Sequence, residues 1–254
     1  RGPTEPGAWS PLMTPPGPNA PAARPVSPTL EAMKTALLIL KKDLAVELRT
    51  REVLLTMTLF STLIVVIFAF AFQLDVDGTR AVAPGLLWVV VVFAGNLGIT
   101  RVMDKERENG ALSGLLLSPG GPIAVFWGKA LGVFIFMLVM ELITIPLALL
   151  FIGIELPAHA IGDIVLALLL GSLGFSLIGT LFGAMLGEAR LREVLVPLVV
   201  YPIIIPVLVA GVKLTALAIS PSMDDETNYL TLILGFDLLY LGLTPWVFAR
   251  VLTP

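Results

Sequence analysis

Six apolar stretches, each about as long as a bilayer is thick, decide what this chain can fold into. A helix needs about 20 apolar residues to cross the hydrocarbon core, and in lipid its backbone polar groups must be bonded within the helix. With 57% hydrophobic and 14% charged residues, the composition is far from that of a soluble domain. We therefore predict an all-α polytopic membrane protein with six transmembrane helices over Val53–Leu74, Ala81–Thr100, Ile123–Ile154, Ile164–Gly187, Val194–Val212 and Leu230–Ala249.

The chain before the first span has two parts. Residues 1–28 contain nine prolines and few large apolar residues, so we predict a disordered tail, with an ancestral start at Met33. Residues 29–254 form the predicted membrane domain. From Thr29 to Glu52, apolar residues recur at helical spacing and cations occupy another face. This pattern predicts an amphipathic helix on the cytoplasmic membrane surface; a soluble coupling segment is the alternative.

Lysine and arginine gather on one side of the predicted membrane. That side holds Lys34, Lys41, Lys42, Arg49, Arg51, Arg101, Lys105, Arg107, Arg190, Arg192 and Arg250. The other side has only Arg80 and Lys213, together with several acidic residues. Because loops rich in Lys and Arg stay in the cytoplasm, we expect both termini to be cytoplasmic.

The loop between the second and third predicted spans is the most informative stretch. The charged run 104–109 is followed by Gly110, by three leucines at helical spacing, and by a proline that ends the pattern at Pro119. This order predicts a short amphipathic helix facing the cytoplasm. A solvated loop resting on the headgroups explains the same charge and periodicity, so both interpretations stay open.

The same loop carries a resemblance to a known superfamily. The run Glu106-Arg107-Glu108-x-Gly110-x-Leu112-x-x-Leu115-Leu116-x-x-Pro119, followed by Gly128-Lys129, resembles the coupling segment of type-2 ABC exporter permeases. Within that superfamily the chain is most similar to the CcmB family, the haem exporter B subunits of bacterial cytochrome c maturation. The further motifs are Lys42-Asp43-Leu44, Ala83-Pro84-Gly85-Leu86-Leu87-Trp88-Val89, Val196-Pro197-Leu198 and Pro206-Val207-Leu208. Gly120-Gly121-Pro122 and Tyr201-Pro202 depart from the family pattern.

The resemblance implies a permease subunit in the bacterial inner membrane. It would couple ATP hydrolysis by a separate subunit to haem export, or to release of a haem-loaded periplasmic chaperone. The implied partners are a CcmA-like ATPase, a CcmC-like haem-handling membrane subunit and a CcmE-like chaperone, with two copies of this chain per complex and no nucleic acid. The implied ATPase-coupling residues are Glu106, Arg107, Glu108, Gly110, Leu112, Leu115, Leu116 and Pro119. A type-2 exporter of a drug, lipid or polysaccharide and a non-transporting scaffold are the alternatives.

We expect no catalytic site in the chain itself. Gly128-Lys129-Ala130 lacks the upstream glycine and the Ser or Thr of a phosphate-binding loop, so ATP and magnesium belong to a partner chain. There is no cysteine, and the single histidine, His159, lies in a non-cytoplasmic loop where a haem iron could in principle be met. A lone surface histidine is weak evidence for such a ligand. We therefore expect no metal and no directly bound cofactor, with haem as a transported or complex-bound ligand.

Two acidic residues fall within predicted spans. An ionised carboxylate in the bilayer centre costs several kcal/mol unless it is paired or hydrated, so Glu141 should face protein or a cavity. It is either a polar contact in a translocation path or a structural hydrogen-bonding acid. The same two interpretations apply to Asp237. Asn96 is expected to form hydrogen bonds between helices.

Small residues and prolines mark two other spans. Gly179, Gly183 and Gly187 line one helical face, which predicts close packing of another helix. Pro197, Pro202 and Pro206 interrupt the hydrogen-bond ladder of the fifth span, and predict either a kink or a re-entrant pair of short helices. We expect a hinge or a subunit interface there.

Overall fold

The computed structural model describes residues 28–71, 76–108, 114, 118, 120–153, 156, 158–187, 189–220 and 226–252. This part of the chain forms seven helices and no strand: α1 (Pro28–Thr50), α2 (Glu52–Ala71), α3 (Val76–Glu108), α5 (Gly121–Ile152), α6 (Ala158–Met185), α7 (Arg192–Ile219) and α8 (Glu226–Leu252). Six of them, α2 to α8, are long and apolar enough to cross a membrane. The prediction of an all-α protein with six transmembrane helices is confirmed.

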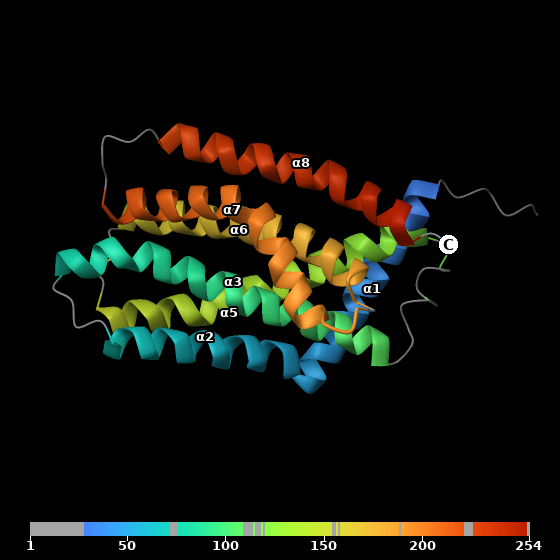
Figure 1. The fold of residues 1–254 in the computed structure, drawn as a ribbon, viewed down its shortest axis with the longest axis horizontal. Coiled ribbons are helices and arrows are strands. Elements are labelled where there is room, and N and C mark those ends of the chain that lie inside the picture. Colours follow the sequence, from blue (N-terminus) through green and yellow to red (C-terminus); the bar gives the residue numbers. More distant parts are fainter. Residues whose placement is uncertain are drawn as a thin grey trace, which may run out of the picture.

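The six long helices lie side by side, and α1 packs across one end of the bundle (Figure 1). We call this the α1 end; α2, α5 and α7 begin there, and α3, α6 and α8 finish there. The start of α1 and the end of α8 therefore lie at the same end of the molecule (Figure 1). Helices α3, α7 and α8 extend past both ends of their predicted spans, most clearly α3, whose last turns carry charged residues up to Glu108.

Helices α3 and α6 form the centre of the bundle. In the most apolar stretch of each helix, 67% of the residues of α3 and 72% of those of α6 are buried inside the protein. The corresponding shares are 22% for α2 and 28% for α8. Gly179 and Gly183 of α6 allow this close packing, because a methyl group on Gly183 would come within 2.8 Å of Ile99 in α3. Gly187 is buried in the turn that follows α6.

A tryptophan fixes α3 to its two neighbours. The Trp88 ring fills the space that side chains on Gly171 of α6 and Gly211 of α7 would occupy. Its Nε1 also donates a hydrogen bond to Thr215 Oγ1 at 3.0 Å. The tryptophan of the Ala-Pro-Gly-x-x-Trp-Val motif is thus a wedge that needs glycine on both facing helices.

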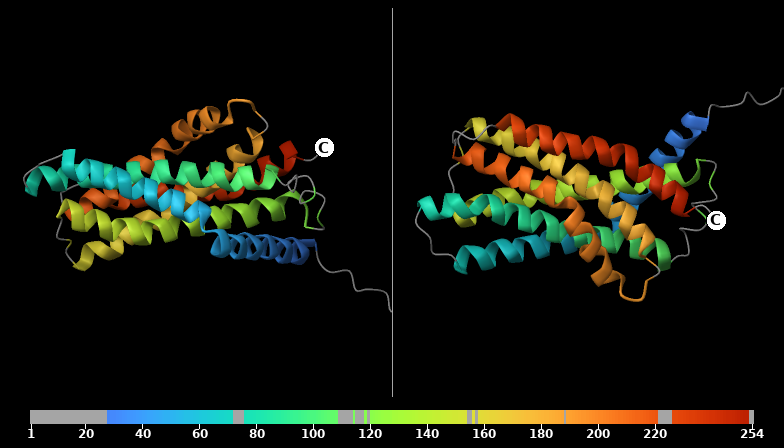
Figure 2. Two further views of the ribbon diagram at one scale, coloured as in Figure 1. Left: turned by 90° about the horizontal axis from the view of Figure 1, so that it is seen from below. Right: turned by 45° about the horizontal axis from the view of Figure 1, so that its top comes forward.

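Helix α7 is continuous and bent. Pro197, Pro202 and Pro206 all lie inside it, and its first half turns away from the line of the second half (Figures 1 and 2). Of the two predicted outcomes, the structure has the kinked helix and not the re-entrant pair. The carbonyls loosened by the prolines explain the bend.

Candidate functional site

A buried cluster of charges joins α1, α3 and α5 at the α1 end. Lys129 Nζ of α5 donates to Asp43 Oδ2 of α1 at 2.7 Å and to Glu106 Oε1 of α3 at 2.6 Å. The three side chains are only 3%, 11% and 8% exposed. Lys42 adds a second cation, 2.7 Å from Glu106 and 3.2 Å from Asp43. We call these four residues the ionic cluster.

Glycines of α5 let α1 come close enough for these contacts. A methyl group on Gly128 would lie 2.8 Å from Ile39 Cβ, and one on Gly120 would lie 2.7 Å from Thr35 Cβ. Gly121, with φ 64°, forms the left-handed turn that starts α5 beside α1. Gly120, the first residue of the small-residue turn that departs from the family pattern, therefore packs against α1.

Glu47 extends the cluster to the corner between α1 and α2. Its side chain is buried, and its Oε1 accepts a hydrogen bond from the Leu54 backbone N–H at 2.8 Å in the first turn of α2. Lys105 of α3 lies 3.4 Å from Glu47 Oε2 and 3.2 Å from Glu52 Oε2. The corner itself is Arg51, with φ 54°.

Three consecutive residues of α3 thus bind different helices. Asp104 faces α7, where Arg192 Nη2 lies 2.9 Å from Asp104 Oδ1 without hydrogen-bond alignment. Lys105 binds the α1–α2 corner, and Glu106 binds α5 and α1. The last turns of α3 therefore connect to four other helices where the predicted coupling segment begins.

The neighbouring carboxylates of the cluster favour the charged form of Lys42. Burial by itself would lower the pKa of Lys42, but the hydrogen bond to Glu106 and the charge of Asp43 outweigh it and raise that pKa above 10.5. The stabilisation from this cation is present through the neutral range and is lost only as the pH rises through the raised pKa.

A cavity of about 270 Å³ adjoins the cluster, and its lining includes the apolar side chains of Val102 and Phe136.

The predicted ATPase-coupling residues fall into two groups. Glu106 lies inside the ionic cluster and not on a free surface. Arg107 and Glu108 belong to the last turn of α3, but their side chains lie outside the described part. Gly110, Leu112, Leu115, Leu116 and Pro119 also lie outside the described residues. The cluster therefore joins the end of α3, which carries the first predicted coupling residue, to the early part of α5, which follows the last one.

The intramembrane acids are buried in the bundle. Glu141 of α5 accepts a hydrogen bond from the Ser172 hydroxyl of α6, and Ser61 of α2 is hydrogen-bonded to Thr144 of α5 at 2.7 Å, one turn further along α5. These contacts join three helices at mid-bundle. They place Glu141 against protein, as its cost in lipid requires.

Asp237 and Asn96 differ from Glu141 in their partners. Asp237 is 1% exposed and neither of its carboxylate oxygens has a hydrogen-bond partner among the described residues. Its Oδ1 lies 2.5 Å from where a Cβ on Gly174 would be, so α8 approaches α6 closely there. The buried Oδ1 of Asn96 also has no partner in the described part, while its backbone carbonyl accepts from Thr100 at 3.0 Å.

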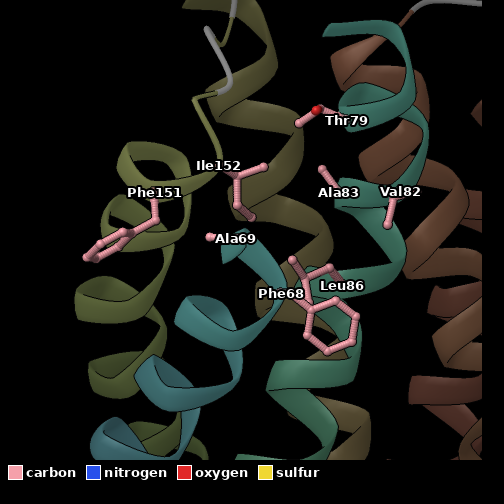
Figure 3. Close-up of a pocket in the computed structure, with 8 residues that line it drawn as sticks. All are labelled: Phe68, Ala69, Thr79, Val82, Ala83, Leu86, Phe151 and Ile152. Atoms are coloured by element: carbon pink, nitrogen blue, oxygen red, sulfur yellow. The ribbon is translucent and has the colours of Figure 1, made fainter. Parts of the chain in front are cut away.

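The far end of the bundle holds an apolar crevice between α2, α3 and α5 (Figure 3). Its volume is about 80 Å³, and its lining is Phe68, Ala69, Thr79, Val82, Ala83, Leu86, Phe151 and Ile152. Phe68 and Leu86 lie close together, and the Thr79 hydroxyl is the one polar group among the labelled side chains (Figure 3).

The described residues contain no cluster of His, Asp and Glu suited to a metal ion, and the His159 side chain lies outside them.

Sequence reasoning missed most of the cluster. It placed Lys42 among the cations of a helix on the cytoplasmic membrane surface and did not use Asp43 or Glu47 as partners. A signal existed in the spacing, because Asp43 and Glu47 are four residues apart on one helical face, beside Ile39. Lys129 in an apolar span needed a counter-ion. The identity of that counter-ion depends on tertiary packing, which spacing does not reveal.

The sequence also matches a known protein family over most of its length. The CcmB protein family matches residues 34–253, nearly the whole of the described part. The chain belongs to the CcmB family. It is 27% identical over 212 residues to heme exporter protein B of Pseudomonas aeruginosa, covering 84% of this chain and 93% of the relative.

Two further relatives have the same description. Heme exporter protein B of Bradyrhizobium diazoefficiens is 23% identical over 214 residues, which cover 84% of this chain and 95% of the relative. That of Haemophilus influenzae is 27% identical over 171 residues, which cover 67% of this chain and 76% of the relative. Membership in the CcmB family, together with six helices able to span a membrane, makes the chain a multi-pass membrane protein.

Proposed function

We propose that this chain is the permease subunit of an ABC-type complex for cytochrome c maturation. ATP hydrolysis by a separate CcmA-like subunit would drive haem export, or the release of a haem-loaded CcmE-like chaperone, with a CcmC-like subunit handling haem. The family match and the name of the relatives, heme exporter protein B, support this assignment. Haem is the substrate of the complex, and two copies of this chain complete it.

The ionic cluster is the observation that carries the coupling role. Glu106 is the first residue of the predicted coupling segment and Lys129 follows the segment, and both side chains bind α1 as well as each other. A displacement of the segment by the ATPase would therefore move the end of α3, the start of α5 and α1 together. Packed interiors transmit such shifts because they deform little.

The distribution of charge supports a cytoplasmic α1 end in the bacterial inner membrane. All of α1, with Lys34, Lys41 and Arg49, lies at that end, as does Arg250 at the end of α8. Arg250 also stacks on Trp246, 5.1 Å from the ring centroid, and tryptophan is a residue enriched at membrane interfaces. Both termini would then face the cytoplasmic ATPase.

The test changes the apolar face of the coupling segment and leaves the buried cluster intact. Leu112→Asp combined with Leu115→Asp should reduce retention of the ATPase on the purified permease at least about tenfold, since each buried leucine contributes roughly 1.5–3 kcal/mol. Leu191→Asp, at an exposed position of the same end outside the segment, is the matched control. Normal ATPase retention by the double variant would exclude docking through this segment.

A separate measurement tests the substrate. Deletion of the gene should abolish haem-stained cytochrome c while the apocytochromes are still made, and the double leucine variant should give the same loss at normal permease level. Normal holo-cytochrome c in the deletion strain would exclude the maturation role, whatever the ATPase retention shows.

A further inference from the structure

The second half of α7 is fixed in the bundle. Val207 and Ala210 are fully buried, and Gly211 lies against the Trp88 ring. Thr215 accepts the Trp88 hydrogen bond at 3.0 Å and donates its own hydroxyl proton to the Gly211 carbonyl at 2.8 Å. The Trp88 ring is packed between Gly171 and Gly211 and is hydrogen-bonded to Thr215 within one turn of Gly211. This close packing leaves the second half of α7 little freedom to move.

The first half of α7 is held differently. It crosses the outside of α3 and stands away from the bundle where it begins (Figure 2). Its outward side chains Val194 and Leu198 are 61% and 64% exposed, while Val196 and Val200 face the core. Val196 and Val200 are buried like Val207 and Ala210, at 5% and 0% exposed. This half differs in lacking the Trp88 ring and its hydrogen bond, and its apolar contacts have little directional preference.

An ion pair ties the tip of this half to α3. Arg192 Nη2 is 2.9 Å from Asp104 Oδ1, and their side chains are 39% and 19% exposed. Asp104 directly precedes Lys105 and Glu106, which bind the α1–α2 corner and α5. The tip of α7 is thus connected to the helix end that enters the predicted coupling segment.

Pro202 and Pro206 separate the two halves. Neither residue has a backbone N–H, so the ladder lacks two bonds within this short stretch. The Ile203 carbonyl, three residues before Pro206, accepts a hydrogen bond from the Tyr240 hydroxyl of α8 at 2.7 Å. The carbonyls that lose their helical donors are those of Leu198 and Pro202, so the Tyr240 bond attaches α8 to the backbone one residue beyond the second of them.

We propose that residues 192–201 form a hinged arm that pivots at Pro202–Pro206 against the fixed second half of α7, with the Asp104–Arg192 ion pair as its latch. Tyr240 is a positioning residue that stabilises the pivot from α8. The arm concerns the chain's own mechanics and goes beyond the proposed haem role. Movement of the α3 end would open or close the latch and so change how far the arm stands from α3.

Spin-label distances in the cysteine-free chain test the arm directly. Leu198→Cys reports the arm and Val209→Cys the fixed half, each paired with Leu59→Cys on α2; all three positions are exposed. The full chain is labelled, diluted with unlabelled chain and reconstituted in lipid nanodiscs. Pulsed electron–electron double resonance then measures both pairs, and no ATPase is needed.

The latch variants are Asp104→Asn, Arg192→Gln and the exchange of Asp104→Arg with Arg192→Asp. Each single change should raise the long-distance fraction of the arm pair roughly two- to five-fold, the range expected for one partly exposed ion pair, and the exchange should reverse it. Pro202→Ala with Pro206→Ala restores two backbone N–H groups and should narrow the distance distribution of the arm pair. The proposal would be overturned if Asp104→Asn left the distance distribution of the arm pair unchanged. It would also be overturned if the distribution of the fixed pair shifted by the same amount.

Discussion

Replacement of Lys129 by methionine tests whether the ionic cluster stabilises the α1 end. The side chain keeps most of its length and loses its charge, which leaves Asp43 and Glu106 with Lys42 alone, at 3.2 and 2.7 Å. Removing one partner of a buried ion pair costs about 3–5 kcal/mol. Because Lys42 stays as a half-exposed partner for both carboxylates, we expect a loss of about 2–3 kcal/mol in the free energy of unfolding.

Reversible unfolding in mixed micelles, with a rising mole fraction of sodium dodecyl sulfate, measures this loss. Trp127, two residues from Lys129 and packed edge-on to Phe126 at 5.6 Å, reports the local change by fluorescence. Lys213→Met, an exposed lysine on α7, is the matched control and should change stability by less than about 0.5 kcal/mol.

A double variant separates charge pairing from simple loss of the lysine. Lys129→Met with Glu106→Gln removes one cation and one anion together, so it should cost less than the sum of the single changes by about 1–2 kcal/mol. Additive costs, or a Lys129→Met effect below about 1 kcal/mol, would show that the cluster is not a coupled unit.

Three further changes probe other contacts. Gly171→Ala should cost about 1–3 kcal/mol in the same unfolding assay because its methyl group meets the Trp88 ring, whereas Gly242→Ala, with open space around it, should be neutral. Arg51→Gly should stabilise by about 1 kcal/mol, since φ at this corner is 54°; a loss of stability would refute strain there. Glu141→Gln can still accept the Ser172 hydrogen bond, so holo-cytochrome c should stay at the wild-type level, and its loss at normal protein level would indicate a functional acid.

The sequence was sufficient for the helices because lipid makes their length and composition decisive. Every predicted span lies within one long helix of the described residues except at the ends of the first, third and fourth, and the bend at the prolines of α7 followed from their missing N–H groups. The ends were placed less well. Charged residues such as Lys105 and Glu106 suggested a loop, yet tertiary ion pairs hold them on α3.

The site was harder to predict, because its partners come from distant parts of the chain. Asp43 and Lys129 are 86 residues apart, and no local pattern pairs them. Trp88 was singled out as part of a motif, but its partners Gly171 and Gly211 lie on two other helices. Sequence patterns identify which side chains need a partner, whereas helix packing chooses it.

The position of Lys129 in the chain has a consequence for how the protein is made. A lysine in an apolar helix resists entry into lipid unless a counter-ion is near, and synthesis proceeds from the N-terminus. Asp43 on α1 and Glu106 on α3 therefore leave the ribosome before Lys129 does, and both carboxylates are available when α5 enters the membrane. Helix α1, which is not among the helices long and apolar enough to span a membrane, thus supplies one of the two counter-ions that Lys129 of α5 needs in lipid.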